Sequence, residues 1–121
     1  MRKFILGRIR GVGYAFKGAY LLITTEASVK TQFFIGVLVT IAGFYFEISK
    51  IEWMIQILTI GLIMGLEGFN TAIEEIADFI HPEHHKKIGL IKDLAAGAVF
   101  IFAIAAVIIG CFIYIPKIIH S

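Results

Sequence analysis

The stretch Leu94–Ile115, LAAGAVFIFAIAAVIIGCFIYI, decides the class of fold because it carries no charged side chain over 22 residues. A helix needs about 20 predominantly apolar residues to cross a hydrocarbon core of ~30 Å. Pro116 and Lys117 follow this stretch directly and mark its end. We therefore predict a transmembrane helix over residues 93–115.

The composition of the whole chain agrees with a membrane protein. Hydrophobic residues make up 59% of the 121 residues and charged residues 17%, whereas a soluble domain of this length carries about a quarter charged residues. The length suits one domain, residues 1–121, and the net charge of +2 gives no reason to expect nucleic acid as a partner. A single cysteine excludes a disulfide within the chain.

Two further apolar segments precede this stretch. Within residues 51–80, the part up to Leu66 is apolar apart from Glu52 near its start. The part after Leu66 carries several carboxylates. Residues 29–48 reach spanning length when Lys30 extends its charged head to the lipid headgroups. The sequence therefore predicts three transmembrane helices.

Residues 4–22 are too charged to cross a bilayer, because Arg8, Arg10 and Lys17 alternate with aromatic and aliphatic side chains. This pattern is typical of a helix that lies in the membrane interface. Four glycines weaken the helix, so a break within it stays open as an alternative. We expect an all-α integral membrane protein with three transmembrane helices and an N-terminal interfacial amphipathic helix.

Basic residues flank the predicted spans unevenly. With three spans, nine of the eleven lie on one side, namely Arg2, Lys3, Arg8, Arg10, Lys17, Lys30, Lys86, Lys87 and Lys92. Only Lys50 and Lys117 lie on the other side. Because basic residues favour the cytoplasmic side, we expect a cytoplasmic N-terminus, a cytoplasmic loop at residues 79–93 and a C-terminus outside.

The chemically informative stretch is EGFNTAIEEIADFI, residues 67–80. At 100° per residue, a helix places four of its polar residues on one face. They are Glu67, Asn70, Glu74 and Asp78. A carboxylate at the bilayer centre costs roughly 3 kcal/mol, so such a stripe is tolerated only near an interface or inside the protein. A solvated extension of the helix remains the alternative interpretation.

The depth of Glu67 suits chemistry on a lipid headgroup. It lies 16 residues after Ile51, about 24 Å along a helix, and so just inside the cytoplasmic edge of the core. A lipid hydroxyl lies near this depth, while a nucleotide arrives from the cytosol. Glu67 and Glu74 are about 10 Å apart along the axis, too far to bind one ion together. We therefore expect different roles for them.

Other polar groups allow weaker inferences. Glu26 stands before the first span, where a solvated interfacial charge is the simpler interpretation. Three histidines at residues 81–85 lack the HExxH or cysteine pairing of a zinc site, and the basic loop around them is compatible with phosphate binding. The chain has no Walker A motif. Gly61 and Gly65 form a GxxxG pair, which permits close helix packing in an oligomer without establishing it.

Several motifs are specific when taken together. ExxNTAIExxxD occupies residues 67–78, EHH residues 83–85, and KDLAAGAV begins at Lys92. GYAFKG at residues 13–18, followed by Glu26, completes the set. With this spacing the whole chain closely resembles the prokaryotic diacylglycerol kinase family, which includes the undecaprenol kinases of Gram-positive bacteria. NTAIE and KDLAAGAV favour the undecaprenol-type branch.

The resemblance implies a homotrimer of three-span subunits in the bacterial cytoplasmic membrane, with active sites shared between neighbours. It implies direct in-line transfer of phosphate from ATP, with Mg²⁺, to a membrane lipid alcohol, either diacylglycerol or undecaprenol. By position, Glu67 resembles the general base, and Glu26 and Glu74 resemble the magnesium ligands. The other residues that the resemblance assigns to the nucleotide site are Arg8, Arg10, Tyr14, Asn70, Asp78, Glu83, His85, Lys92 and Asp93.

The chain departs from the family pattern after Glu26, where Gram-positive members resemble E-x-N-x-R-I-H. Ser28, Lys30 and Gln32 stand at those positions instead. Replacement of arginine by lysine loses a bidentate donor, so the family's substrate contacts do not carry over to these positions. The sequence does not identify the lipid alcohol.

Phosphoryl transfer needs positioning and charge neutralisation more than covalent chemistry. Two carboxylates on a metal, one base and a few cations supply these parts, so we hypothesise a lipid kinase. A small proton-coupled transporter is the first alternative, but it would need a carboxylate deep in a span. A non-catalytic membrane adaptor is the second, and it would leave the acidic stripe without a role.

Overall fold

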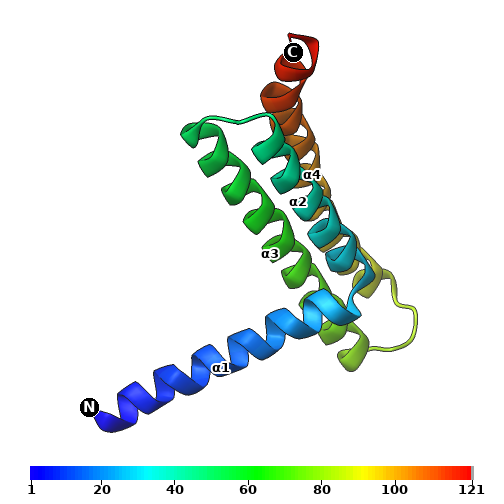
Figure 1. Cartoon of the computed structure of the whole chain (residues 1–121). Coiled ribbons are helices and arrows are strands. Elements are labelled where there is room, and N and C mark those ends of the chain that lie inside the picture. Colours follow the sequence, from blue (N-terminus) through cyan, green and yellow to red (C-terminus); the bar gives the residue numbers. More distant parts are fainter. Residues whose placement is uncertain (121) are drawn as a thin grey trace.

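The computed structural model describes residues 1–120 as four α-helices. They are α1 (Arg2–Thr25), α2 (Ala27–Tyr45), α3 (Lys50–Ile80) and α4 (Lys86–Ile119). The described residues contain no strand. Helices α2, α3 and α4 lie side by side as a bundle in which α3 contacts both of the others, and α1 projects sideways from one end (Figure 1).

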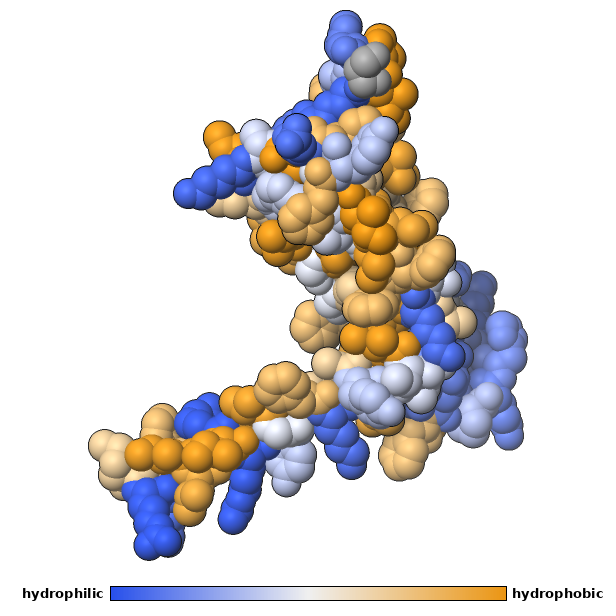
Figure 2. Space-filling model, viewed as in Figure 1, coloured by the Kyte–Doolittle hydropathy of each residue, from blue (hydrophilic) through white to orange (hydrophobic). Residues whose placement is uncertain are grey.

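The all-helical architecture predicted from the sequence is confirmed. Helices α2, α3 and α4 are each long and apolar enough to cross a membrane. Figure 2 shows apolar side chains over the middle of the bundle and hydrophilic ones at both of its ends. The chain is therefore a multi-pass membrane protein.

Several helix boundaries differ from those expected. Helix α1 runs unbroken through its glycines and extends beyond residues 4–22 at both ends. Helix α4 begins at Lys86 rather than at residue 93, because His85 caps it by accepting a hydrogen bond from the Lys87 backbone N–H at 3.1 Å. It also continues through Pro116 to Ile119, where proline lies near the end of the helix. Helix α3 begins one residue earlier than expected.

Helix α2 ends three residues before the expected position, in a tight turn. The Ile48 backbone N–H donates to the Gly43 carbonyl at 3.1 Å, and the Glu47 N–H donates to the Phe44 carbonyl at 3.3 Å. This pair of bonds is a Schellman motif. It places Glu47 in the left-handed region, with φ at 51°.

Several polar side chains near the end of the bundle that carries this turn are paired with one another. We call this end, with Ser49, Glu52, Gln56, Tyr114 and Lys117, the Lys117 end. Ser49 and Glu52 form a capping box at the start of α3. The Lys117 ammonium of α4 lies 3.0 Å from the Glu52 carboxylate. The Tyr114 hydroxyl donates a hydrogen bond to the side-chain oxygen of Gln56. These contacts join α3 to α4 at this end.

Close packing of α2 on α3 follows a seven-residue spacing. The buried residues of α2 are Val29, Gly36 and Gly43. Residues seven apart lie on the same side of a packed helix. A Cβ on Gly36 would stand 3.2 Å from Ile60 of α3, so the two helices lie close together there. At Gly61 and Gly65, no other helix of the described chain comes within 4 Å of a Cβ position. The GxxxG pair therefore packs no helices together within one chain.

Candidate active site

The polar residues of α3 continue the stripe through which α3 faces the other helices. Successive residues of this stripe are separated alternately by four and three positions. They are Gln56, Ile60, Ile63, Glu67, Asn70, Glu74 and Ala77. Glu67 and Asn70 are each only 8% exposed. A solvated extension of the helix therefore does not describe these two residues. Asp78 differs from them, because it is exposed.

Glu67 lies where three helices meet. From α2, the Gln32 Nε2 donates a hydrogen bond to Glu67 Oε2 at 3.5 Å. From α1, Leu22 packs against Gly68, the residue after Glu67 on α3. A Cβ on Gly68 would stand 3.0 Å from Leu22 Cδ1. Glu67 is thus held inside the bundle, near the end from which α1 projects (Figure 1).

Asn70 and Glu74 form a second polar pair one turn further along α3. The Asn70 Nδ2 donates to Glu74 Oε1 at 3.3 Å. The Asn70 Oδ1 and the Gln32 Oε1 are both buried, and neither has a hydrogen-bond partner among residues 1–120. A buried acceptor without a donor costs about 1–3 kcal/mol. Two such atoms near Glu67 indicate a site that a ligand or ordered water completes. We call Gln32, Glu67, Asn70 and Glu74 together the Glu67 end.

Asp78 and Lys92 connect α3 to α4 beside the loop between them. The Lys92 Nζ lies 2.5 Å from Asp78 Oδ1, and both side chains are partly exposed. Within the loop, His81 Nδ1 donates to the backbone carbonyl of Glu83 at 2.8 Å. The rings of His81 and His85 lie 5.1 Å apart between centroids. The loop is therefore folded on itself, with the Glu83 and His85 side chains exposed.

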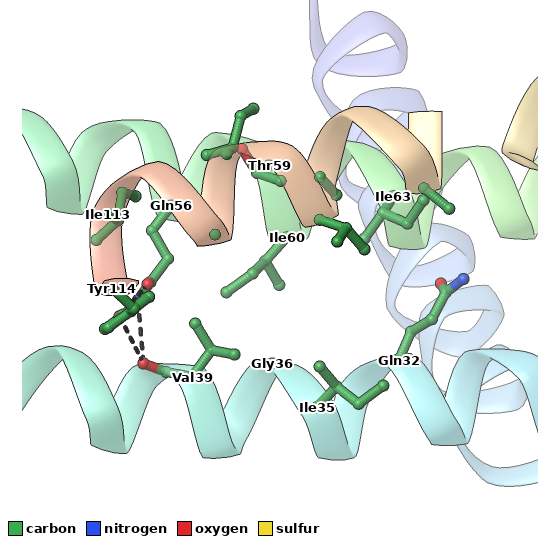
Figure 3. Close-up of a pocket in the computed structure, with 15 residues that line it drawn as sticks. Gln32, Ile35, Gly36, Val39, Gln56, Thr59, Ile60, Ile63, Ile113 and Tyr114 are labelled. Atoms are coloured by element: carbon green, nitrogen blue, oxygen red, sulfur yellow. Dashed lines mark hydrogen bonds between the residues drawn. The ribbon is translucent and has the colours of Figure 1, made fainter. Parts of the chain in front are cut away.

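An apolar slot of about 420 Å³ runs between α2, α3 and α4, and the sequence analysis did not predict it. Figure 3 shows Gln32 at one end of the slot and Tyr114 at the other. Its walls between these ends are mostly aliphatic, including Ile35, Ile60 and Ile63. Because Gln32 is hydrogen-bonded to Glu67, the slot begins beside that carboxylate.

Comparison with known proteins places this arrangement in a family. The sequence profile described as prokaryotic diacylglycerol kinase matches residues 13–114, most of the chain. The chain belongs to the prokaryotic diacylglycerol kinase family. Membership confirms the resemblance found in the motifs and makes the chain a lipid kinase.

Relatives within the prokaryotic diacylglycerol kinase family agree with the branch predicted from the motifs. The chain is 42% identical to the undecaprenol kinase of Bacillus subtilis over 86% of this chain and 85% of that protein. It is 36% identical to a diacylglycerol kinase of Synechocystis over 85% of this chain and 59% of that protein. Identity to the Escherichia coli K12 diacylglycerol kinase is 31%, over 85% and 84% of the two chains.

Some residues that the family resemblance assigns to the nucleotide site are not brought to Glu67 within one chain. Arg8, Arg10 and Tyr14 are exposed on the part of α1 that projects away from the bundle (Figure 1). The Arg8 guanidinium lies over the Phe4 ring instead, 5.6 Å from its centroid. Asp93 is exposed near the start of α4.

The side chains at this end of the kinase include oxygen donors, the kind of ligand that magnesium binds. Glu26 is the single non-helical residue between α1 and α2, at the same end of the bundle as Glu74 (Figure 1). Residues 1–120 contain no group of three His, Cys, Asp or Glu side chains that would hold a metal by themselves. Mg²⁺ usually takes only one or two carboxylates and completes its coordination with water and phosphates. Glu74 and the unpartnered Oδ1 of Asn70, whose amide donates to Glu74, are donors of that kind, and Glu26 would add a second carboxylate.

The contact of Glu67 that sequence reasoning missed is Gln32. The sequence held no signal for this contact, because only the structure shows that Val29 and Gly36, three residues before and four residues after Gln32, are buried. That spacing places Gln32 on the side of α2 that faces α3. The sequence analysis noted Gln32 only as a departure from the family pattern.

Proposed function

We propose that the chain phosphorylates the hydroxyl of a membrane lipid alcohol, diacylglycerol or undecaprenol, with ATP as the phosphoryl donor. The observation that carries this proposal is the position of Glu67, a carboxylate only 8% exposed at the start of an apolar slot. A hydrocarbon chain suits the slot, and a hydroxyl at its end would meet the carboxylate. The names of the relatives, undecaprenol kinase and diacylglycerol kinase, support the two candidate lipids.

In this proposal Glu67 is the general base. The lipid hydroxyl donates a hydrogen bond to the Glu67 carboxylate, and its proton passes to that carboxylate during transfer. The hydroxyl oxygen forms a bond to the γ-phosphorus of ATP while the bond from that phosphorus to the β–γ bridging oxygen breaks in line. ADP leaves, and the lipid carries the phosphate.

Glu26 and Glu74 would hold Mg²⁺, which neutralises charge on the β- and γ-phosphates when it is bound. Asn70 fixes the direction of the Glu74 carboxylate through its hydrogen bond at 3.3 Å. Glu74 lies two turns of α3 beyond Glu67, about 10 Å along the axis. This separation supports distinct roles for the base and the metal ligands.

We place the nucleotide beside the loop between α3 and α4. Lys92, which pairs with Asp78, would exchange that carboxylate for a phosphate when ATP binds. Helix α1 projects away from its own bundle (Figure 1), so its residues would close over the nucleotide of a neighbouring subunit. This geometry supports active sites shared between subunits, and the family resemblance supports a homotrimer. The nucleotide-site residues in the proposal are Arg8, Arg10, Tyr14, Asp78, Glu83, His85, Lys92 and Asp93.

We further propose that α1 lies in the cytoplasmic interface of the bacterial cytoplasmic membrane, with the C-terminus outside. The uneven distribution of basic residues supports this orientation, as does the mixture of apolar and basic side chains on α1 (Figure 2). A reporter fused after Ser121 should be active outside the cell, and one inserted between Pro82 and Lys87 should be active in the cytoplasm. The reverse pattern would place the loop on the side without ATP.

The direct test is transfer of label from γ-labelled ATP to lipid by the purified protein with magnesium. Diacylglycerol and undecaprenol are supplied separately in the same mixed micelles. We expect labelled lipid phosphate with at least one of them and none without added lipid. A folded preparation that labels neither lipid would contradict the proposal.

A further inference from the structure

The slot between the helices contains two glutamines, and their side chains are used differently. Gln56, at the Lys117 end, is only 4% exposed. Its Nε2 donates to the Val39 carbonyl at 3.4 Å, and its Oε1 accepts from the Tyr114 hydroxyl. Gln32, at the other end of the slot (Figure 3), donates to Glu67 alone, and its buried Oε1 lacks a partner within the described chain.

The backbone of Gln32 is fixed although its amide is not used by the fold. Val29 and Gly36, close to one turn before and after it, are both buried. The approach of Gly36 to Ile60, where a Cβ would stand at 3.2 Å, shows how closely α2 packs on α3 there. The Gln32 side chain therefore starts from a rigid position and reaches across to Glu67 of α3. No other protein partner in residues 1–120 orients its amide.

We propose that Gln32 is a positioning residue for the catalytic base: its amide N–H holds one carboxylate oxygen of Glu67, so that the other oxygen is turned toward the lipid hydroxyl. This inference rests on the proposed lipid kinase function. It assigns a role to the hydrogen bond that joins Glu67 of α3 to α2.

Physical chemistry supports such a role for an amide donor. A glutamate side chain has several rotatable bonds, and ordering a long side chain costs up to about 2 kcal/mol. A neighbouring N–H donor offsets part of that cost and so keeps the proton-accepting oxygen in one place. A base held within a narrow range of orientations before substrate arrives transfers the proton more effectively. A glutamine needed only for folding would be satisfied at both atoms, as Gln56 is.

The test compares substitutions that separate the N–H donor from side-chain size. Gln32→Met keeps the length but removes the donor, and Gln32→Leu removes all polarity in a branched side chain. Gln32→His changes the shape but keeps an N–H. Because one hydrogen bond to a charged group is lost, we expect the Met and Leu variants to lower kcat on saturating lipid about ten-fold. The kcat of the His variant should stay within about three-fold of that of the unmodified chain. KM for MgATP should be unchanged in all three variants.

The matched control is Thr31→Val, at the neighbouring position of the same helix, where the exposed hydroxyl donates to the Ala27 backbone carbonyl at 2.9 Å. We expect it to keep kcat on lipid, because Thr31 lies outside the slot and makes no hydrogen bond to Glu67. If Thr31→Val lowers kcat as much as Gln32→Leu does, the effect belongs to this segment of α2 and the proposal is wrong. Full activity in Gln32→Met, or a His variant as weak as the Leu variant, would also overturn it.

A double-mutant cycle separates positioning from an independent contribution. In a Glu67→Gln background, Gln32→Leu should cause no further loss beyond about two-fold, because residues that act through one another are not additive. A full additional ten-fold loss would overturn the proposal. Absence of turnover by the unmodified chain on both lipids would instead refute the kinase function, and the positioning role with it.

Discussion

The two ends of the helix bundle both carry buried polar side chains, but only one end pairs them fully. At the Lys117 end, both side-chain atoms of Gln56 are hydrogen-bonded. At the Glu67 end, Gln32 and Asn70 each keep a buried oxygen without a partner in the described residues. Such atoms cost about 1–3 kcal/mol each. An end that keeps two of them beside a buried carboxylate is arranged for binding rather than for stability.

Because of this difference, we expect substitutions at the two ends to have opposite effects on function and on stability. Substitutions at the Glu67 end should change turnover or ligand affinity more than the free energy of unfolding. Substitutions near the Lys117 end should change the free energy of unfolding and leave turnover per folded molecule alone. An exception in either direction would break the division between a binding end and a structural end.

The largest effect is expected for Glu67→Gln. The amide keeps the size and loses the proton acceptor, so turnover on saturating lipid should fall by about 10²–10⁴-fold. MgATP affinity and the free energy of unfolding should change little. The matched control is Glu75→Gln, an exposed carboxylate of the same helix, which should keep full turnover. Near-normal turnover in Glu67→Gln would refute the base assignment, and a parallel loss of MgATP binding would move Glu67 to the metal site.

A smaller effect is expected for Glu26→Gln and Glu74→Gln, the proposed magnesium ligands. Each should weaken MgATP binding and activity by at least about ten-fold, the scale seen even for partners outside the ligand shell. The double variant should lose little more than the worse single variant, because groups that serve one ion are not additive. The measurement is MgATP affinity as a function of magnesium concentration. Unchanged nucleotide binding in both single variants would rule out the shared ion.

The sequence predicted the position of the Glu67 end better than the contacts made there. Glu67, Asn70 and Glu74 are neighbours on one helix, so helical periodicity alone was enough to place them on one face. Gln32 lies 35 residues before Glu67, on another helix. A single glutamine in an apolar span has no periodic signal for its partner, and only the packing of α2 on α3 brings the two together.

The start of α4 was predicted less well for a different physical reason. The start of α4 was expected at residue 93 because Lys86 and Lys87 do not belong in hydrocarbon. A helix need not end where the membrane ends, and α4 begins instead where His85 caps its N-terminus. Asp78 was expected on the stripe with Glu67 but is exposed and paired with Lys92. Which partner such an exposed charged side chain finds depends on the conformation of the loop between α3 and α4, and hydropathy does not predict that conformation.

A loss of stability without loss of turnover is expected for Gly43→Ala near the Lys117 end. A Cβ on Gly43 would stand 2.6 Å from Trp53 Cη2, and the Trp53 ring already packs against Phe44 at 4.9 Å between centroids. Forcing atoms into such a contact typically costs 1–3 kcal/mol. Unfolding in mixed micelles, followed by helical circular dichroism, measures the change.

The control for Gly43→Ala is Gly61→Ala, where no neighbouring helix of the described chain comes within 4 Å of the new Cβ. Within one chain this change should be neutral or stabilising by up to about 1 kcal/mol, because alanine favours a helix over glycine. A destabilisation equal to that of Gly43→Ala would mean that Gly61 packs against another subunit. The GxxxG pair would then serve the assembly rather than the fold of one chain.

The smallest effect is expected for Glu47→Gly, in the turn between α2 and α3. Glu47 adopts a φ of 51°, a conformation that costs a residue with a Cβ roughly 1–2 kcal/mol and costs glycine almost nothing. Glycine is the residue most often found at this position of a Schellman motif. The greater freedom of glycine in the unfolded chain offsets part of the gain. We therefore expect stabilisation below about 1 kcal/mol, measured by the same unfolding assay, with turnover unchanged.

Glu47→Ala separates backbone strain from charge as the source of that gain. Alanine removes the carboxylate but keeps the Cβ, so it should not stabilise the protein if strain is the cause. Equal stabilisation by alanine and glycine would assign the effect to the lost charge instead. A rise in turnover with either variant would carry more weight, because it would couple the turn at the Lys117 end to the chemistry at the Glu67 end. The two ends could then no longer be treated as independent.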